Sequence, residues 1–431
     1  MGIAMLVIGL VILTVLAILG VPIIVASVAS SIFVLITSGQ GILTGLTGGY
    51  MTSFANYVSN YYLIFVLGAI FGKMCEISGA TESIARTVVN KFGEKYVVLG
   101  IIVAAAILGF GGVNLFVALF ALYPLSMSLF KRADLPRHLF PGTYIAGAAT
   151  FAMTSPFTPS TQNITPTSYL GTTLAAGVVP GLIGTVFCAV CVSIYMNWRA
   201  KKVKANGEHF VPMPYDNFKD DDNQDLPSLV VALLPLIILI ILLNAFGLPV
   251  VTALFLGIVI AIIIYWKWMP HKFADMWTQI SSGASNGISS LINTAATVGF
   301  GGVVSSAPAF ATIATLIEQN AQNGNAYLTC AIAVAALAGV SGSASGGLGI
   351  AVPIVGEIFM PLGISADAIH RIAVVASSSL DSLPHNGFVC TCLGYSHCTH
   401  RESYFDIFVV SVLVTIVETF LVVGLYTMGL S

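Results

Sequence analysis

Long apolar runs separated by short polar stretches make up most of this sequence. A bilayer core about 30 Å thick is crossed by a helix of about 20 apolar residues, so each long run predicts a membrane span. Seven runs are clear: residues 2–19, 21–38, 59–75, 172–198, 227–245, 249–266 and 404–428. Pro, Gly, Ser and Thr residues interrupt two further spans, 139–170 and 369–400.

Two apolar stretches, 96–130 and 326–360, are too long for one helix and contain small residues at their centres. The centre of the first reads GFGGVN (109–114), and that of the second reads SGSASGG (341–347). Each arm is shorter than the about 20 residues of a full crossing. Both stretches are therefore predicted to be re-entrant hairpins whose tips lie inside the membrane.

Lys and Arg residues gather in a few places along the chain, and cytoplasmic loops of membrane proteins carry an excess of them. These places are residues 73–95, residues 131–137, residues 199–204, and Lys267 with Lys272. If all are cytoplasmic, the first hairpin enters from the cytoplasm and the second from outside. The loop 39–58, which has no Lys or Arg, and both termini then lie outside. The distribution predicts ten spans, nine of which have the ranges given above, and two hairpins of opposite orientation, with residues 199–226 as a solvated cytoplasmic linker.

The order of the predicted elements repeats along the chain. With a shift of 229 residues, span 2–19 overlaps span 227–245, and hairpin tip 109–114 overlaps tip 341–347. Each half has five spans, an odd number, so the halves have opposite topology. Inverted repeats with discontinuous helices are typical of secondary transporters. One long irregular bundle without a repeat is the alternative.

The expected fold class is therefore an all-α polytopic membrane protein with two inverted repeats of five spans, each with a re-entrant hairpin and a broken helix. The first repeat is expected over residues 1–200, the cytoplasmic linker over 201–226, and the second repeat over 227–431.

Composition narrows the class of protein further. Of the 431 residues, 57% are hydrophobic and 8% are charged, against roughly 25% charged in a typical soluble domain. This excludes a soluble globule and a disordered chain. The formal net charge is −2 with no basic tract, so no nucleic-acid partner is expected. No Gly-x-x-x-x-Gly-Lys-Ser/Thr loop for ATP is present, and neither an enzyme nor a bound cofactor is expected.

The hairpin tips and the interrupted spans are the candidate substrate site. Irregular backbone at membrane depth is tolerated where it lines a cavity or is buried in protein. Helix N-termini exposed there suit a small carboxylate, and hydroxyl and amide side chains suit substrate hydroxyls. The predicted substrate-binding residues are Gly111, Gly112, Asn114, Thr154, Ser155, Thr158, Thr161, Gln162, Asn163, Ser341, Ser343, Ser345, Ser382, His385 and Asn386. The alternative is that these small polar residues only pack helices together.

Asp381 and His385 are the candidate proton-coupling residues, because ionisable residues inside a membrane are functional candidates by default. They are four residues apart and share a face if this piece is helical. The alternative is that the pair only shapes the break. Glu418 lies in the last apolar span with no evident partner. The ligand spacing in Cys390–His400 matches no strong zinc signature, and no metal is predicted.

Several motifs resemble the gluconate:proton symporter (GntP) family. They are LGAIFGKMCEISGATESIARTVVNKFG (67–93), ILGFGGVNLFVALFALYPLSMSLFKRADLPRHLFPGTYIAGAATFAMT (107–154), SGSAS (341–345), His385-Asn386-Gly387-Phe388 and Thr399-His400-Arg401-Glu402-Ser403-Tyr404. The resemblance implies the ion-transporter superfamily fold in a bacterial inner membrane, working as a dimeric elevator. It also implies proton-coupled uptake of a small organic acid such as a gluconate-like sugar acid, a hydroxycarboxylate or an amino-carboxylate.

Three alternative functions share part of this interpretation. A Na⁺-coupled carboxylate transporter would use the same fold, with Na⁺ held by tip carbonyls together with Asn114, Thr161 and Ser343. A channel would need a ring of charge along a pore, and no such ring is visible in the sequence. A membrane enzyme would need a convergent nucleophile and base, which only Asp381 and His385 approach.

The topology is tested by cysteine labelling. In a Cys-free variant, a single Cys at position 431 should react with a membrane-impermeant reagent added to intact cells. A single Cys at position 210 should stay unlabelled, because its segment is expected in the cytoplasm. Labelling of position 210 from outside would overturn this topology.

Overall fold

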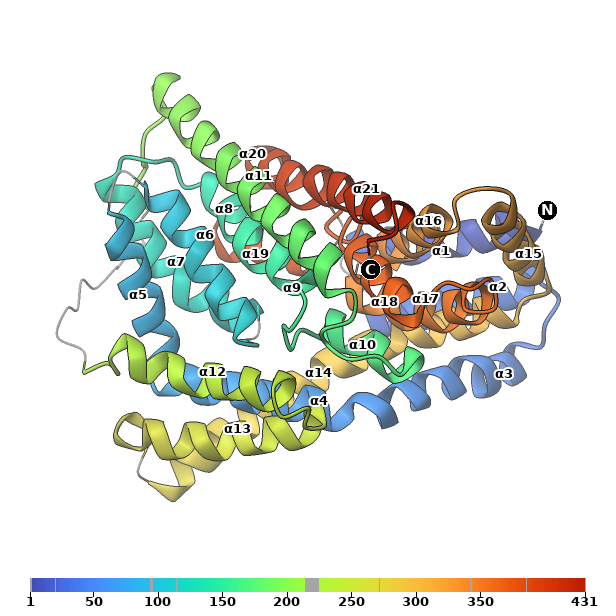
Figure 1. Cartoon of the computed structure of the whole chain (residues 1–431), viewed down its shortest axis with the longest axis horizontal. Coiled ribbons are helices and arrows are strands. Elements are labelled where there is room, and N and C mark those ends of the chain that lie inside the picture. The colour runs from blue at the N-terminus through green and yellow to red at the C-terminus, as the bar shows by residue number, and fades with distance from the viewer. Residues whose placement is uncertain are drawn as a thin grey trace.

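The computed structural model describes residues 2–19, 21–93, 96–113, 115–213, 225–270, 272–341, 343–384 and 386–430. Over these ranges the regular structure is helical throughout, which confirms an all-α protein (Figure 1). Within the described ranges, five helical segments are able to cross a membrane by length and composition: Ile42–Ile77, Val178–Ala205, Val250–Trp268, Ala274–Ser306 and His400–Thr427.

Apart from the segment between α11 and α12, the helices follow one another with short connections. In the first half they are α1 (Gly2–Ile18), α2 (Ile23–Thr37), α3 (Ile42–Gly45), α4 (Met51–Ile77), α5 (Ala80–Phe92), α6 (Val97–Phe110), α7 (Leu115–Arg132), α8 (Leu139–Ile145), α9 (Ala152–Thr154), α10 (Thr161–Leu170) and α11 (Val178–Ala205). In the second half they are α12 (Leu229–Asn244), α13 (Val250–Tyr265), α14 (Phe273–Ser306), α15 (Pro308–Asn323), α16 (Ala326–Ser341), α17 (Ala344–Phe359), α18 (Ala366–Ser377), α19 (Gly387–Tyr395), α20 (His400–Ile407) and α21 (Val414–Thr427). The π-helical segments Leu46–Tyr50, Ala146–Phe151 and Phe408–Leu413 join α3 to α4, α8 to α9 and α20 to α21.

The prediction of a loop over residues 39–58 is wrong, because a continuous helix begins at Ile42 and runs into α4. Gly49 of this helical segment packs closely against α14, and α4 and α14 lie side by side (Figure 1). A Cβ atom on Gly302 would lie 2.4 Å from the carbonyl oxygen of Gly49 and 2.2 Å from Oγ of Ser53. Small residues of this kind let two helix backbones approach each other in a membrane.

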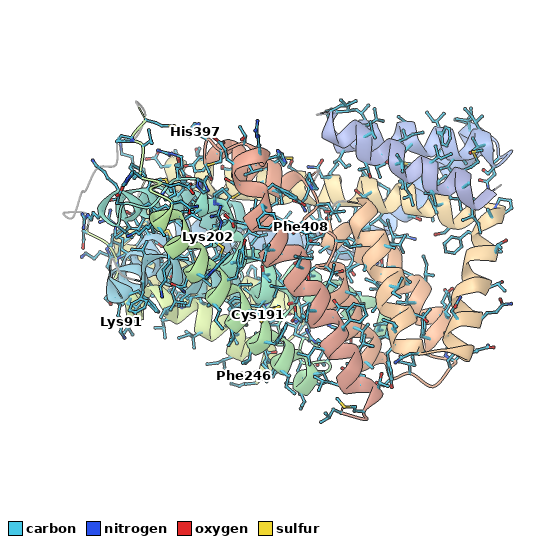
Figure 2. All side chains as sticks on the ribbon, turned by 90° about the horizontal axis from the view of Figure 1, so that it is seen from above. Lys91, Cys191, Lys202, Phe246, His397 and Phe408 are labelled. Atoms are coloured by element: carbon cyan, nitrogen blue, oxygen red, sulfur yellow. The ribbon has the colours of Figure 1, made fainter. Side chains whose placement is uncertain are left out.

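The helix α14, with 34 residues, is a span to which the apolar pattern assigned no range. Ser, Asn, Thr and Gly residues dilute its hydropathy, and its second half is buried against α2, α4 and α17. The helix α5 also replaces much of the expected cytoplasmic loop 73–95. Figure 2 places Lys91 of α5 and Lys202 of α11 toward the same end of the molecule.

The two stretches expected to be hairpins each form a pair of packed helices, α6 with α7 and α16 with α17. The turn after α6 contains Gly112 with φ of +79°. This left-handed conformation favours glycine, which has no Cβ to clash. The helix limits agree with the expected ranges 96–130 and 326–360 to within a few residues.

The two interrupted spans are broken by different chemistry. In the first, Pro156 disfavours a helical conformation for Ser155, which is extended with ψ of 144°. In the second, the hydroxyls of Ser377, Ser378 and Ser379 each donate to a carbonyl three residues earlier. Such bonds compete with the continuation of a helix. We name residues 155–160 the first break and residues 378–386 the second break.

The described part of the expected linker contains regular structure and fixed contacts. The helix α11 continues to Ala205, and the next residues bind the turn between α7 and α8. There His209 Nδ1 lies 2.6 Å from Asp134 Oδ2, and Phe210 N–H donates to the same carboxylate. The hydrogen bond from His209 lowers the pKa of Asp134.

The crossing of α4 and α14 leads to a stability prediction. Gly302→Ala should lower the free energy of unfolding by about 1–3 kcal/mol, because the new Cβ overlaps backbone atoms of the partner helix. Thermal unfolding of the purified protein measures the effect. The matched control is Gly48→Ala, since a Cβ there meets no atom within 4 Å. Equal unfolding temperatures for the two variants would contradict close packing at the crossing.

Candidate functional site

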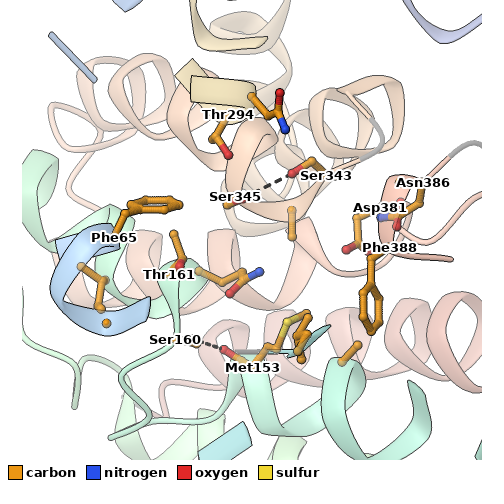
Figure 3. A pocket seen from close by; sticks show the side chains of 18 of the residues that line it. Phe65, Met153, Ser160, Thr161, Thr294, Ser343, Ser345, Asp381, Asn386 and Phe388 are labelled. Carbon is orange, nitrogen blue, oxygen red and sulfur yellow. Dashed lines mark hydrogen bonds between the residues drawn. The ribbon is translucent and has the colours of Figure 1, made fainter. Parts of the chain in front are cut away.

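A cavity of about 610 Å³ lies where the two hairpin tips and the two breaks meet. Figure 3 shows side chains from these segments around one space, with Thr161 facing Ser343, Ser345 and Asp381 across it. The predicted site residues that line the cavity are Gly112, Thr161, Gln162, Ser343, Ser345, Asp381, Ser382 and Asn386.

Other predicted residues do not line this cavity. Gly111, Thr154, Ser155, Thr158 and Asn163 are buried behind its wall. Asn114, His385 and the side chain of Ser341 lie outside the described part of the chain.

The first break is closed by Ser160, which caps the helix α10. Its Oγ donates to the carbonyl of Met153, 2.6 Å away, and accepts from the backbone N–H of Asn163 (Figure 3). This single hydroxyl therefore joins the end of α9 to the start of α10. The first turn of α10, with Thr161 and Gln162, is presented to the cavity.

The second half of the chain builds a comparable wall. Ser343 caps α17 by accepting from the N–H of Gly346, and Asn386 caps α19 by accepting from the N–H of Val389. Asp381 lies between these two helix starts and is 6% exposed. Its Oδ1 accepts from the hydroxyl of Ser382 at 2.9 Å, and the backbone of Ala344 hydrogen-bonds its carboxyl group.

Four helices of the hairpins and broken spans begin at this cavity. Their first residues, Leu115 of α7, Thr161 of α10, Ala344 of α17 and Gly387 of α19, all line it. Helix N-termini carry partial positive charge and N–H groups without intrahelical partners. Two helix starts from each half of the chain thus converge on one space, which suits an anion.

The helix α14 adds polar residues that sequence reasoning missed. Asn293, Thr294 and Thr297 line the cavity, and Phe65 and Phe388 supply apolar wall. The signal was available, because an Asn within an apolar run of a membrane protein is itself a candidate for function. It was overlooked because this run was not recognised as a span.

Arg371 is a further residue that sequence reasoning missed. It lies on α18, is fully buried, and donates hydrogen bonds to the backbone carbonyls of Thr154, Leu174 and Ala176. These carbonyls lie at the end of α9 and in the connection between α10 and α11. From the other half of the chain, Arg371 therefore holds the end of α9, just before the first break, and the connection that follows α10. Its position in the predicted span 369–400 was the signal, since a charge there is costly unless it has a role.

His370 holds the same region beside Arg371. Its Nε2 lies 3.1 Å from Oδ1 of Asn163 and its Nδ1 lies 2.7 Å from Oγ1 of Thr172. The amide of Asn163 donates to the carbonyls of Thr158 and Leu174, so its oxygen must accept from Nε2–H of His370. The side chain of Asn163 is thus committed to the shape of the first break.

Among the described residues, no group of three or more His, Cys, Asp and Glu side chains is placed to hold a metal ion. Within the stretch 390–400, Nε2 of His400 instead lies 2.9 Å from the carbonyl of Pro384, and Sγ of Cys390 donates to the same carbonyl.

Comparison with known proteins identifies related chains. The model of the family described as GntP family permease matches residues 1–248. An uncharacterized transporter of Bacillus subtilis, YxjC, is 32% identical over 94% of each chain. The high-affinity gluconate transporter of Escherichia coli is 27% identical over 43% of this chain and 41% of its own.

A solved structure shares the fold. The YdaH transporter of Alcanivorax borkumensis superposes with a TM-score of 0.62 over 90% of this chain and 89% of its own, at 16% sequence identity. The described helices therefore share the fold of that protein.

The buried guanidinium leads to a second stability prediction. Arg371→Lys should lower the free energy of unfolding by about 1–3 kcal/mol, because one ammonium group cannot reach all three carbonyls. Arg401→Lys is the matched control, since Arg401 is exposed on α20. Denaturation of both variants in the same lipid or detergent measures the difference. Equal stability of the two would mean that Arg371 does not hold the first break together.

Proposed function

This chain belongs to the GntP permease family, and from that premise we propose that it takes up a small organic acid anion together with a proton. Membership makes the chain a membrane transporter rather than an enzyme. The substrate, the coupling ion, the dimeric state and the bacterial inner membrane are parts of the proposal.

The convergence of four helix N-termini on one cavity is the observation that carries the proposal. The helices α7, α10, α17 and α19 direct their first turns toward the same space, where they favour a negative charge. No Lys or Arg lines the cavity among the described residues. The carboxylate of a substrate would be held by backbone dipoles and hydroxyls rather than by an ion pair.

The rest of the lining supports a hydroxylated or amino-substituted acid. Thr161, Gln162, Asn293, Thr294 and Ser343 offer hydroxyl and amide groups at the cavity wall. These groups can both donate and accept hydrogen bonds, as substrate hydroxyls require. The volume of about 610 Å³ suits a molecule of the size of a sugar acid.

Two inverted repeats, each with a re-entrant hairpin and a broken helix, are part of this proposal. In support, α6 and α16 begin 229 residues apart, at Val97 and Ala326, and α7 and α17 begin 229 residues apart, at Leu115 and Ala344. A Ser caps the helix that follows the first break, and another Ser caps the second arm of the second hairpin. Equivalent helix starts around one pseudo-two-fold axis would place a single site near the bilayer midplane.

Packing also supports an elevator mechanism. The helices α1, α2, α4, α12, α13 and α14 contact one another extensively, as do α10, α11, α16, α17, α18 and α21. The cavity lies between these two groups, with lining from both. We propose that the second group, with the α6–α7 hairpin, carries the substrate along the first, which would be the fixed part of a homodimer.

In this proposal, Asp381 binds the proton that is transported together with the substrate. It is the one acidic residue among the described residues that line the cavity. A substrate anion and an ionised Asp381 repel each other in a buried site, so substrate is bound when Asp381 holds a proton. Proton and anion would then enter together. On the cytoplasmic side, release of one would favour release of the other.

The test uses purified protein in liposomes with labelled gluconate, or with the carboxylate that a thermal-shift screen selects. Asp381→Asn should abolish accumulation driven by an imposed pH gradient and keep exchange of labelled for unlabelled substrate, because the amide mimics the protonated acid. Asp275→Asn, an exposed acid at the start of α14, is the control and should accumulate substrate like the wild type. Accumulation by Asp381→Asn without Na⁺ would remove Asp381 as the carrier, and uptake that requires Na⁺ would replace the proton by Na⁺.

A further inference from the structure

A row of polar side chains lies against α11, outside the cavity. Gly177, Gly181, Gly184 and Cys188 follow one face of this helix at intervals of three and four residues. The helices α18 and α21 pack along it, and α21 runs beside α11 in Figure 1. This face therefore consists of small residues that admit bulky polar groups from the neighbouring helices.

Each glycine of this face leaves room for a polar side chain from a neighbouring helix. A Cβ atom would lie 2.1 Å from the hydroxyl of Tyr426 at Gly177, 2.9 Å from Nε of Arg371 at Gly181, and 2.9 Å from Oε1 of Glu418 at Gly184. The three side chains thus occupy successive positions along α11. None of them lines the cavity described above.

Glu418 is only partly satisfied in this row. It is 1% exposed, and its Oε2 accepts from Sγ of Cys188 at 2.9 Å. Its Oε1 is buried and has no hydrogen-bond partner. In the described part of the chain no Lys, Arg or His forms an ion pair with it.

These surroundings suit a neutral carboxylic acid better than a carboxylate. A thiol is a weak donor, and one such bond compensates little of the cost of burying a charge. That cost is several kcal/mol for each unpaired ion even after relaxation. A proton on Oε1 removes the charge and leaves Oε2 to accept from Cys188.

Arg371 is the charged group that faces Glu418 from α18. Their contact points on α11, Gly181 and Gly184, are one helical turn apart. The guanidinium is bonded to three backbone carbonyls and to no carboxylate among the described residues. Its positive charge is therefore available to balance the negative charge that forms when Glu418 loses its proton.

The other titratable groups near this row come from each element packed on it. They are Cys188 and Cys191 of α11, Asp367 at the exposed start of α18, the buried His370 of α18, which is bonded to Asn163 and Thr172, Tyr426 of α21, and Tyr327 of α16, which stacks on Tyr426 at 5.7 Å. The π segment Phe408–Leu413 has no titratable side chain. Arg371 is thus the sole buried cation of the described row.

We propose that Glu418 is a proton-binding site separate from the substrate cavity, with Arg371 as the counter-charge of its ionised form. The proton binds Oε1 and is released from the same atom. This inference does not depend on the substrate or on the role of Asp381.

Infrared difference spectroscopy tests the site in the full-length protein in lipid nanodiscs. An Asp381→Asn background removes the acid of the cavity. A change from acidic to alkaline pH should then reveal loss of the carbonyl stretch of one buried carboxylic acid. Glu418→Gln should abolish this band, whereas Glu357→Gln, an exposed acid on α17, should leave it unchanged.

Cys188→Ser provides an independent measurement that does not alter the acid. A hydroxyl donates a stronger hydrogen bond than a thiol, so the carbonyl band of Glu418 should shift to lower frequency without disappearing. A buried-acid band that persists in Glu418→Gln, or that stays at the same frequency in Cys188→Ser, would overturn the proposal.

Discussion

Backbone N–H and C=O groups that leave a helix inside a membrane need partners within the protein, because lipid offers none. The two breaks of this chain depend on that requirement. In the first, the carbonyls are taken by Arg371 and Asn163, and Ser160 bridges the two helix ends. In the second, Tyr404 donates to the carbonyl of Ser382, and Asn386 donates to that of Asp381.

This division of partners explains why the cavity is suited to anions. Arg371, the charged side chain that satisfies carbonyls, lies behind the first break and is excluded from the cavity lining, whereas Ser160 and Asn386, which do line the cavity, are uncharged. The helix N-termini face the cavity instead. The polarity of the site is therefore a property of backbone direction, and the hydroxyls and amides around it adjust the details.

The sequence allowed prediction of elements whose pattern is local. The pairs α6–α7 and α16–α17 fit their expected ranges, since a long apolar run with a glycine-rich centre leaves few alternatives. The predicted loop over 39–58 was wrong, because a glycine such as Gly49 is equally compatible with a turn and with the close crossing of two helices. The polar segments that meet at the cavity were anticipated from their composition, but which residues face it depends on helix rotation. Thr161 and Asn163 are two residues apart, and only the first lines the cavity. The roles of His370 and Arg371 depend on partners about 200 positions away, which no local pattern contains.

The link between Arg371 and the first broken span has a consequence for biosynthesis. Its hydrogen bond to Thr154 joins residues 217 positions apart. The ribosome therefore delivers the whole first half, and most of the second, before the carbonyls at the end of α9 meet their final donor. Until then this part of the nascent chain must keep those groups in water, in the translocation machinery or against other helices. The first half alone is thus an incomplete folding unit, and its maturation waits for α18.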